Sequence, residues 1–463
     1  MRVLESCRVS LPPDSAAEKT LTLTFFDLIW LYLPRPSRLF FYEFPHPSNH
    51  FTTTILPKLK HSLSLALQIF YPFAGSLTWS PSSAEPQIRC VDGDSVSLTV
   101  AESTADVNHL SGNHARYANQ FSPLVPCLPS LLDSDIAPVL ALQVTVFPNS
   151  GFCIGITSSH VVADGRSLFH FIRSWASICS LGGDLSPLSG SLPFYDRTVI
   201  KDPDGLLKKI YLQEIAGFKF VVSSSEQGAE LPVERLQATF LVNRTDVDRL
   251  KQWLLAHCND NETQIQKSPL PFSTFVVICA LTWVCLIKVG AVKSSPTKTM
   301  EHFVVSADCR GRLVDPPVPT TYFGNCVTLC FAKANRGDLI GERGFPIAAK
   351  AIADAIRRLE DGVLNGAERW ISESGSLVEE GAVTVAGSPR FGAYEADFGW
   401  GRPKKHEVVG KGEGHFSFYD GSDGEGAVEV GLALSKPKMD AFATLFVNGL
   451  NVARRIHDRT VMV

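Results

Sequence analysis

Residues 139–179, VLALQVTVFPNSGFCIGITSSHVVADGRSLFHFIRSWASIC, contain the pattern that decides the fold. Two apolar runs, residues 139–147 and 152–158, flank the turn-forming letters PNSG, which predicts two neighbouring strands. From Ser167 to Cys179 the apolar residues recur at helical spacing. The stretch therefore predicts a strand that ends near His160 and a helix that begins shortly after it. At such connections α/β proteins place exposed functional groups.

Strand-like and helix-like segments alternate through the rest of the chain, which predicts an α/β fold. Residues 58–70 have apolar residues at helical spacing, and residues 274–288 are apolar on every side, which predicts a buried helix. The β-branched and aromatic residues of 21–33, which end at prolines, indicate an extended segment entering a core.

Two domains of typical size account for the 463 residues. Residues 182–206 are rich in Gly, Pro, Ser and Asp and lack periodicity, so we expect a crossover loop there. This loop separates an N-terminal domain, residues 1–181, from a C-terminal domain, residues 207–463. Lys404, Lys405 and Lys411 form a small basic loop in the second domain, and we expect it to be solvated.

Composition and charge exclude several classes of protein. The 43 Lys and Arg against 47 Asp and Glu leave a net charge of −4, so nucleic acid is not an expected partner. The longest apolar run, residues 275–287, is shorter than the ~20 residues of a membrane span, and the first residues lack the apolar stretch of a secretory signal. The 11 cysteines lack C-x-x-C pairs, which indicates a reducing compartment and predicts a cytoplasmic location.

The first motif with chemical potential is His160-Val-Val-Ala-Asp164-Gly165. Spacing alone leaves three interpretations open. The histidine is a core residue bonded to a carbonyl, or a neutral general base that takes a proton from a hydroxyl, or a metal ligand. No further His or Cys lies at ligand spacing, so we predict no metal site.

The second motif is Asp397-Phe-Gly-Trp-Gly401. Gly399 and Gly401 flank Trp400, which indicates a tight turn with closely packed backbone. A structural role is one interpretation. In the other, Trp400 lines a cleft and its indole N–H, which is only a donor, bonds a developing oxyanion.

The order and wide separation of the two motifs resemble those of the plant BAHD acyltransferases, over essentially the whole chain. Residues 322–326 (YFGNC), 21–27 (LTLTFFD) and 385–391 (VAGSPRF) further resemble the subgroup that acylates anthocyanins and other phenolic glycosides. The resemblance implies two chloramphenicol-acetyltransferase-like domains with a solvent channel between them, and a monomer by family default.

The resemblance also implies roles for the motif residues. His160 is the general base that deprotonates an acceptor hydroxyl, whose oxygen attacks the thioester of an acyl-CoA directly, without an acyl-enzyme, cofactor or metal. Asp164 and Asp397 are structural, each paired with an arginine, and Arg310 or Arg312 is the expected partner of one of them. Gly165, Gly399 and Gly401 shape the two loops, and Trp400 lies close to the intermediate.

Acyl-CoA is thus an expected co-substrate, and four residues are candidates to bind it. Ser273 and Thr274 start the helix of residues 274–288, where free N–H groups favour anions, although simple capping explains them equally. Ser388 and Arg390 lie in a segment that lines the CoA end of the channel in relatives. Arg390 is a phosphate candidate, or simply an exposed arginine.

The identity of the acyl group depends on three further residues. Arg166 stands where relatives that use malonyl-CoA often have arginine, and its planar fork suits a carboxylate, although it is also explained as an exposed residue at a helix start. Tyr32 occupies a place where some relatives have histidine, and with Trp30 it suits stacking on an aromatic acyl chain. On the strength of Arg166 we favour malonyl over hydroxycinnamoyl as the acyl group. The expected acceptor is a sugar hydroxyl of a phenolic glycoside. A degenerate binding protein and a metal hydrolase are the competing hypotheses.

Overall fold

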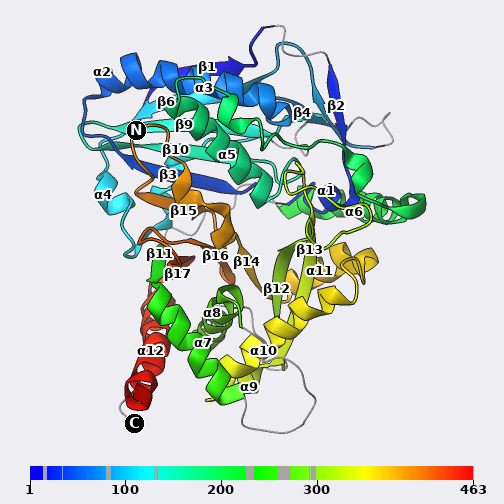
Figure 1. The fold of residues 1–463 in the computed structure, drawn as a ribbon, viewed down its shortest axis with the longest axis vertical. Helices are drawn as coiled ribbons and strands as arrows, with labels where there is room; N and C mark the ends of the chain where they lie inside the picture. The colour runs from blue at the N-terminus through cyan, green and yellow to red at the C-terminus, as the bar shows by residue number, and fades with distance from the viewer. Residues whose placement is uncertain are drawn as a thin grey trace.

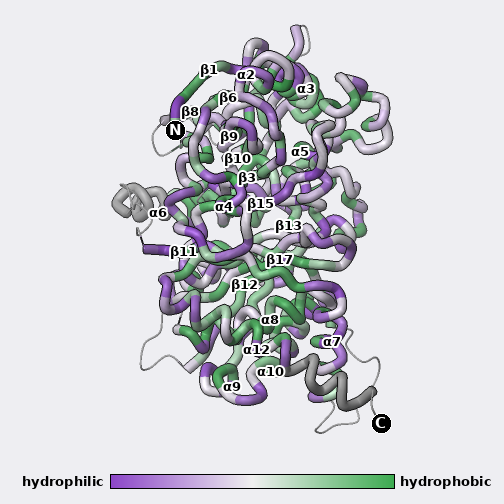
Figure 2. The backbone as a smooth tube through the Cα atoms, turned by 90° about the vertical axis from the view of Figure 1, so that its left-hand side faces the viewer, coloured by the Kyte–Doolittle hydropathy of each residue, from purple (hydrophilic) through white to green (hydrophobic). Residues whose placement is uncertain are grey.

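The structure, a computed structural model, contains two α/β halves stacked along the long axis of the molecule (Figure 1). It describes residues 1–13, 18–33, 35–79, 85–129, 131, 134–225, 234–258, 272–290, 292 and 299–461. Each half has its own large cluster of buried apolar side chains. In the C-terminal half this core lies around helix α8, Thr274–Lys288, which is hydrophobic along its length (Figure 2).

The N-terminal half is built on a six-stranded sheet and a smaller four-stranded one. The first sheet has the order β1 (Arg2–Ser10), β6 (Ser95–Glu102), β9 (Leu140–Phe147), β10 (Gly151–Ser158), β3 (Ser37–Glu43) and β15 (Lys405–Val409). The second has the order β2 (Lys19–Thr22), β5 (Gln87–Cys90), β4 (Ser76–Thr78) and β8 (Ile136–Pro138). The helices of this half are α1 (Phe25–Leu28), α2 (Ser48–His50), α3 (Leu56–Ile69), α4 (Val107–Leu110) and α5 (Gly165–Ser180), and α6 (Leu206–Ser225) follows the crossover.

The C-terminal half is built on a seven-stranded sheet. Its order is β13 (Val327–Asn335), β12 (Met300–Asp308), β14 (Val383–Ala386), β16 (His415–Asp420), β17 (Val428–Ser435), β11 (Arg235–Val242) and β7 (Arg116–Tyr117). Besides α8, its helices are α7 (Arg244–Cys258), α9 (Arg336–Ile340), α10 (Gly344–Arg357), α11 (Trp370–Glu379) and α12 (Lys436–Val461).

Two strands cross between the halves. β15 comes from the C-terminal part of the chain but pairs with β3 of the N-terminal sheet, while β7 comes from the N-terminal part and pairs with β11. The division into residues 1–181 and 207–463 therefore does not separate the two sheets. Residues 182–206 contain only short 3-10 helices, and within them Phe194 bridges to Tyr322.

Buried charges accompany the crossing strand β15, so the expectation of a solvated basic loop was wrong for Lys405 and Lys411. Both lysines are buried. Lys405 pairs with Glu429 at 2.8 Å, and Glu407 pairs with Arg116 at 2.7 Å. These charges need partners because burial removes them from water, and the partners come from other strands of the two halves.

Most predicted elements are present, and one segment differs. Strands β9 and β10 pair antiparallel, and helices α3, α5 and α8 occupy the predicted positions. Residues 21–33, in contrast, are not extended, since a strand ends at Thr22 and α1 follows. The reason is a capping box, in which the Asp27 carboxylate accepts hydrogen bonds from the backbone N–H and hydroxyl of Thr24.

Candidate active site

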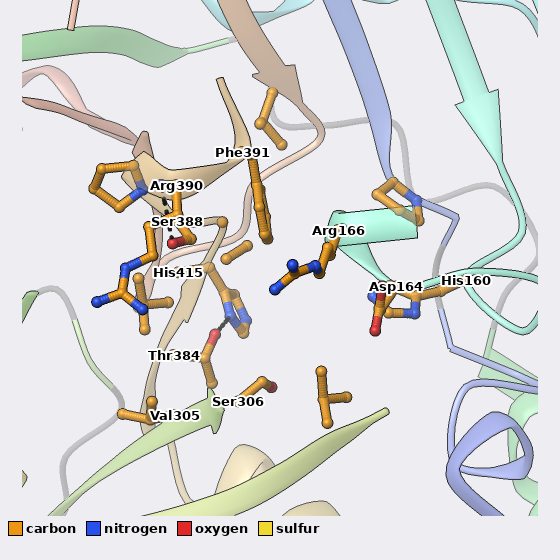
Figure 3. Close-up of a pocket in the computed structure, with 18 of the residues that line it drawn as sticks. His160, Asp164, Arg166, Val305, Ser306, Thr384, Ser388, Arg390, Phe391 and His415 are labelled. Carbon is orange, nitrogen blue, oxygen red and sulfur yellow. Dashed lines mark hydrogen bonds between the residues drawn. The ribbon is translucent and has the colours of Figure 1, made fainter. Parts of the chain in front are cut away.

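A cavity of about 2210 Å³ lies between the two halves. The N-terminal half contributes His160, Asp164 and Arg166 to its wall, and the C-terminal half contributes the strand ends and loops opposite them (Figure 3). Figure 3 shows Arg166 reaching toward the space between His160 and His415. The cavity is therefore lined by residues of both halves.

His160 follows strand β10 and leads into the turn before α5. Its Nδ1 lies 3.0 Å from Oδ1 of Asn325, a residue of the other half. The indole of Trp30 stacks on the imidazole, with ring centroids 3.9 Å apart and planes at 20°. The ring is therefore held from two sides while it lines the cavity.

Hydrogen bonding to Asn325 decides which nitrogen of His160 carries the proton. Asn325 Nδ2 donates to Oδ1 of Asp27 and to the carbonyl oxygen of His160, both at 2.9 Å. The amide oxygen must therefore face the ring, so Nδ1 carries the hydrogen and Nε2 keeps its lone pair. A nitrogen in this state can accept a proton from a hydroxyl.

The sequence interpretation missed both Asn325 and Asp27 as parts of the site. Asp27 lies in residues 21–27 and Asn325 in residues 322–326, two stretches whose only apparent significance was the family resemblance. One signal was present, because Asp27 is the only charged residue in the apolar run 21–33 and is fully buried. A buried carboxylate in such a run requires several donors, and the structure supplies them from Thr24 and Asn325.

Burial is the main reason why His160 binds a proton weakly. Desolvation lowers the pKa of the imidazole to about 4, because the charged form loses water. The nearby charges act in opposite directions, since Asp164 raises this pKa and Arg38 lowers it, while the hydrogen bond with Asn325 raises it slightly. The ring is therefore neutral, and ready to act as a base, at neutral pH.

Asp164 is a structural residue, and Arg310 is its partner. The carboxylate caps helix α5 by accepting from Ser167 N at 2.9 Å, and it also accepts from Cys326 N at 3.1 Å. Arg310 Nη2 lies 2.8 Å away, and both side chains are buried. The structure thus chooses Arg310 over Arg312, which is exposed. The next position, Gly165, has no room for a larger residue, because a Cβ there would lie 2.5 Å from the ring of Phe391.

The second motif is structural in a different way than expected. Asp397 has no arginine partner in the described part of the chain, and its Oδ1 instead accepts from the backbone N–H of Gly399 and Gly401 at 2.8 and 3.0 Å. Both glycines have φ of +99°, a conformation that L side chains rarely adopt. The carboxylate therefore closes its own turn.

Trp400 does not line the cavity, which corrects its expected position near the intermediate. Its ring stacks on Phe398, with centroids 6.2 Å apart, and meets Phe152 edge-on at 5.8 Å. These apolar neighbours hold the indole against the core of the N-terminal half, so packing is the role of Trp400 in this structure.

The four residues predicted to bind CoA all line the cavity on the side of the C-terminal half. Ser273 caps α8 by accepting from Val276 N, and Ser388 Oγ accepts from Arg390 N, which Figure 3 shows as a dashed line. The Arg390 side chain is exposed. Beside them Thr384 is hydrogen-bonded to Nδ1 of His415.

The three residues predicted to recognise the acyl group also line the cavity, with different environments. Arg166 is exposed and pairs with Asp308 at 2.9 Å. Trp30 covers His160, and Tyr32 stacks on Trp79 at 6.3 Å. Burial raises the pKa of the Tyr32 hydroxyl to about 12, so it stays a neutral donor.

Comparison with known proteins now identifies the family. The model of the Transferase family matches residues 6–447. The chain belongs to this family, the BAHD acyltransferases. It is an acyl-CoA-dependent acyltransferase, as predicted. Vinorine synthase superposes with a TM-score of 0.64 at 20% identity, over 95% of this chain and 96% of that one, which confirms the fold class.

Two named relatives are similar to this chain over nearly its full length. The chain is 38% identical to malonyl-coenzyme A:anthocyanin 3-O-glucoside-6''-O-malonyltransferase of Dahlia pinnata, over 98% of both chains. It is 36% identical to coumaroyl-CoA:anthocyanidin 3-O-glucoside-6''-O-coumaroyltransferase 1 of Arabidopsis thaliana, over 97% of both. No helix among the described residues of this acyltransferase is long and apolar enough to cross a membrane.

The buried pair that supports the His160 loop predicts a large effect on stability. Arg310→Met leaves the Asp164 carboxylate buried without its counter-charge, which typically costs about 3–5 kcal/mol. Urea unfolding of the purified BAHD enzyme measures this loss. Arg312→Met is the matched control and should change the free energy of unfolding by less than about 1 kcal/mol, because that arginine is exposed. Equal losses in the two variants would contradict the assignment.

The low pKa of His160 predicts activity that persists into acid. Because only the neutral ring accepts a proton, kcat/KM should stay level from pH about 8 down to about 5 and fall as pH approaches the pKa of about 4. Initial rates across this range, at pH values where circular dichroism shows native protein, provide the measurement. An acid limb centred at the ordinary histidine pKa would mean that the ring is solvated.

Proposed function

We propose that this BAHD enzyme transfers a malonyl group from malonyl-CoA to a sugar hydroxyl of a phenolic glucoside. The observation that carries the proposal is the neutral imidazole of His160, whose Nδ1 hydrogen faces Asn325 and which lines a cavity between the two halves. A cytoplasmic location is part of the proposal, since the cysteines of the chain are unpaired in the structure. A monomer is also part of it, and that part rests on the family resemblance alone.

The proposed reaction is a single acyl transfer. His160 Nε2 takes the proton of the sugar hydroxyl as the oxygen bonds to the thioester carbonyl carbon, which gives a tetrahedral intermediate. The C–S bond then breaks, and the leaving thiolate receives the proton from the imidazolium as free CoA. The ring returns to its starting state, so the cycle needs no covalent enzyme intermediate.

Acyl-CoA is proposed to enter from the C-terminal half. Ser273 and Thr274 stand at the N-terminus of α8, a helix of 15 residues, where the free N–H groups favour phosphate. Ser388 and Arg390 lie on the loop after β14, and the exposed guanidinium suits a second phosphate. The acceptor then approaches His160 from the N-terminal side.

Malonyl is favoured over hydroxycinnamoyl because of charge in the cavity. Arg166 reaches into the space beside His160, where it suits the free carboxylate of a malonyl group (Figure 3). The aromatic side chains of Trp30 and Tyr32 favour the alternative donor, p-coumaroyl-CoA, which one relative's name contains. Donor preference therefore tests the finer part of the proposal.

Loss of the imidazole should remove most turnover and leave donor binding intact. His160→Ala deletes the base, and general base catalysis typically contributes ~10²–10⁴-fold. Mass-spectrometric assay of glucoside acylation measures turnover, and calorimetric titration with CoA measures binding. Unchanged turnover in folded His160→Ala protein would reject the role of His160, and an inactive wild type with a full panel of donors would favour the degenerate binding protein.

The donor assignment predicts a selective effect at position 166. Arg166→Leu should lower kcat/KM for malonyl-CoA about tenfold, which is the effect of losing one charged hydrogen bond, and should change kcat/KM for p-coumaroyl-CoA little. Arg166→Lys is the matched control, because it keeps the charge and loses only the planar fork. An equal loss with both donors would exclude Arg166 as the residue that recognises the carboxylate.

A further inference from the structure

Arg38 is a buried arginine in the cavity wall, and no carboxylate of the described residues pairs with it. It stands at the start of β3 and is only 6% exposed. Its Nε and Nη1 are buried and have no hydrogen-bond partner, and no hydrogen bond or ion pair joins its Nη2 to the described residues. Nη2 is therefore the nitrogen through which Arg38 meets the cavity.

The two arginines that are buried even more deeply than Arg38, Arg116 and Arg310, are both paired with carboxylates. Arg116 binds Glu407, and Arg310 binds Asp164 and Asp308. Arg166, although exposed, also shares Asp308. Because burial of a charge without a partner is costly, the exception at Arg38 calls for an anion that arrives from outside the chain.

The surroundings of Arg38 strengthen its attraction for an anion. The guanidinium lies over the ring of Phe169, 5.6 Å from the centroid, and its strand neighbours are Ile156 and Val408. Such apolar walls exclude water and increase the strength of each charge interaction. The same charge lowers the pKa of His160, as well as that of the buried His406, so it acts at the reaction centre.

Two more residues that line the same cavity have unpartnered donors. Trp30 Nε1 and Tyr32 Oη are buried without hydrogen-bond partners, and both residues line the cavity. Trp30, Tyr32 and Arg38 therefore contribute donors to the cavity, and a carboxylate, which accepts up to four hydrogen bonds, complements such donors.

We propose that Arg38 binds the free carboxylate of a dicarboxylic acyl donor and is the main determinant of its selection. This inference rests on the proposed malonyl donor. Arg166 assists, but its charge is already offset by Asp308, so it contributes less to the selection. The thioester end of the donor then lies toward His160.

The test compares Arg38→Met and Arg166→Leu with three donors, malonyl-CoA, acetyl-CoA and p-coumaroyl-CoA. Arg38→Met should lower kcat/KM for malonyl-CoA about 100-fold and for the two donors with neutral acyl groups less than about threefold, since only malonyl carries a carboxylate. Arg166→Leu should have the same selectivity with a smaller loss. An equal loss with all donors in Arg38→Met would overturn the proposal.

The melting temperature of Arg38→Met distinguishes ligand binding from a structural role. If Arg38 held the fold together, its loss would lower the melting temperature. Arg38→Met removes an unpaired buried charge, so the melting temperature should stay level or rise. Arg116→Met is the matched control and should lower it, because Glu407 then stays buried without that arginine. A fall of the same size in Arg38→Met would show that Arg38 has an internal partner and would overturn the proposal.

Binding separates the failure of this inference from the failure of the proposed function. In the wild type, malonyl-CoA should raise the melting temperature more than acetyl-CoA does, and Arg38→Met should remove most of this difference, with Arg166 accounting for the rest. A wild type that binds and transfers p-coumaroyl but not malonyl would overturn both the malonyl donor and the role of Arg38. A wild type that prefers malonyl, with the preference unchanged in Arg38→Met, would overturn the role of Arg38 alone.

Discussion

The buried carboxylate of Asp164 is the constraint on which the site depends. A charge removed from water must be paired and hydrogen-bonded, and Asp164 meets this need with Arg310, Cys326 N and Ser167 N. Two of these groups belong to the C-terminal half. Satisfying one charge therefore fastens the loop that carries His160 to the opposite half and fixes the wall of the cavity.

A second connection between the halves sets the chemical state of the base. Asp27 orients the amide of Asn325, and the amide oxygen then faces Nδ1 of His160. Nε2, the nitrogen proposed to accept the proton, is left unprotonated, and no carboxylate of the described residues contacts the ring. This arrangement agrees with the low pKa, because a contacting carboxylate would favour the imidazolium.

Much of the fold could be predicted from local patterns, and the failures have two causes. Helix α8 was predicted with its bounds because an apolar run with a serine cap is a local signal. Lys405 and Lys411 were expected in a solvated basic loop because charged residues there look exposed in sequence. In the structure β15 begins at Lys405, and the partners of Lys405 and Glu407, Glu429 and Arg116, come from other strands. Trp400 was misplaced for a similar reason, since its neighbour Phe152 lies far away in the chain. The second cause is local, because the N–H groups of Gly399 and Gly401 bind Asp397 in place of the expected arginine.

The sequence by itself determined the acyltransferase family, the two motifs and the residue types that the chemistry requires. These depend only on the order and spacing of residues along the chain, which the sequence contains directly. Only the tertiary structure decided which arginine pairs with Asp164, how Asn325 orients His160, and that Arg38 is buried without a partner. These facts depend on which side chains meet across two halves, and burial turns such meetings into large energies that no local pattern contains.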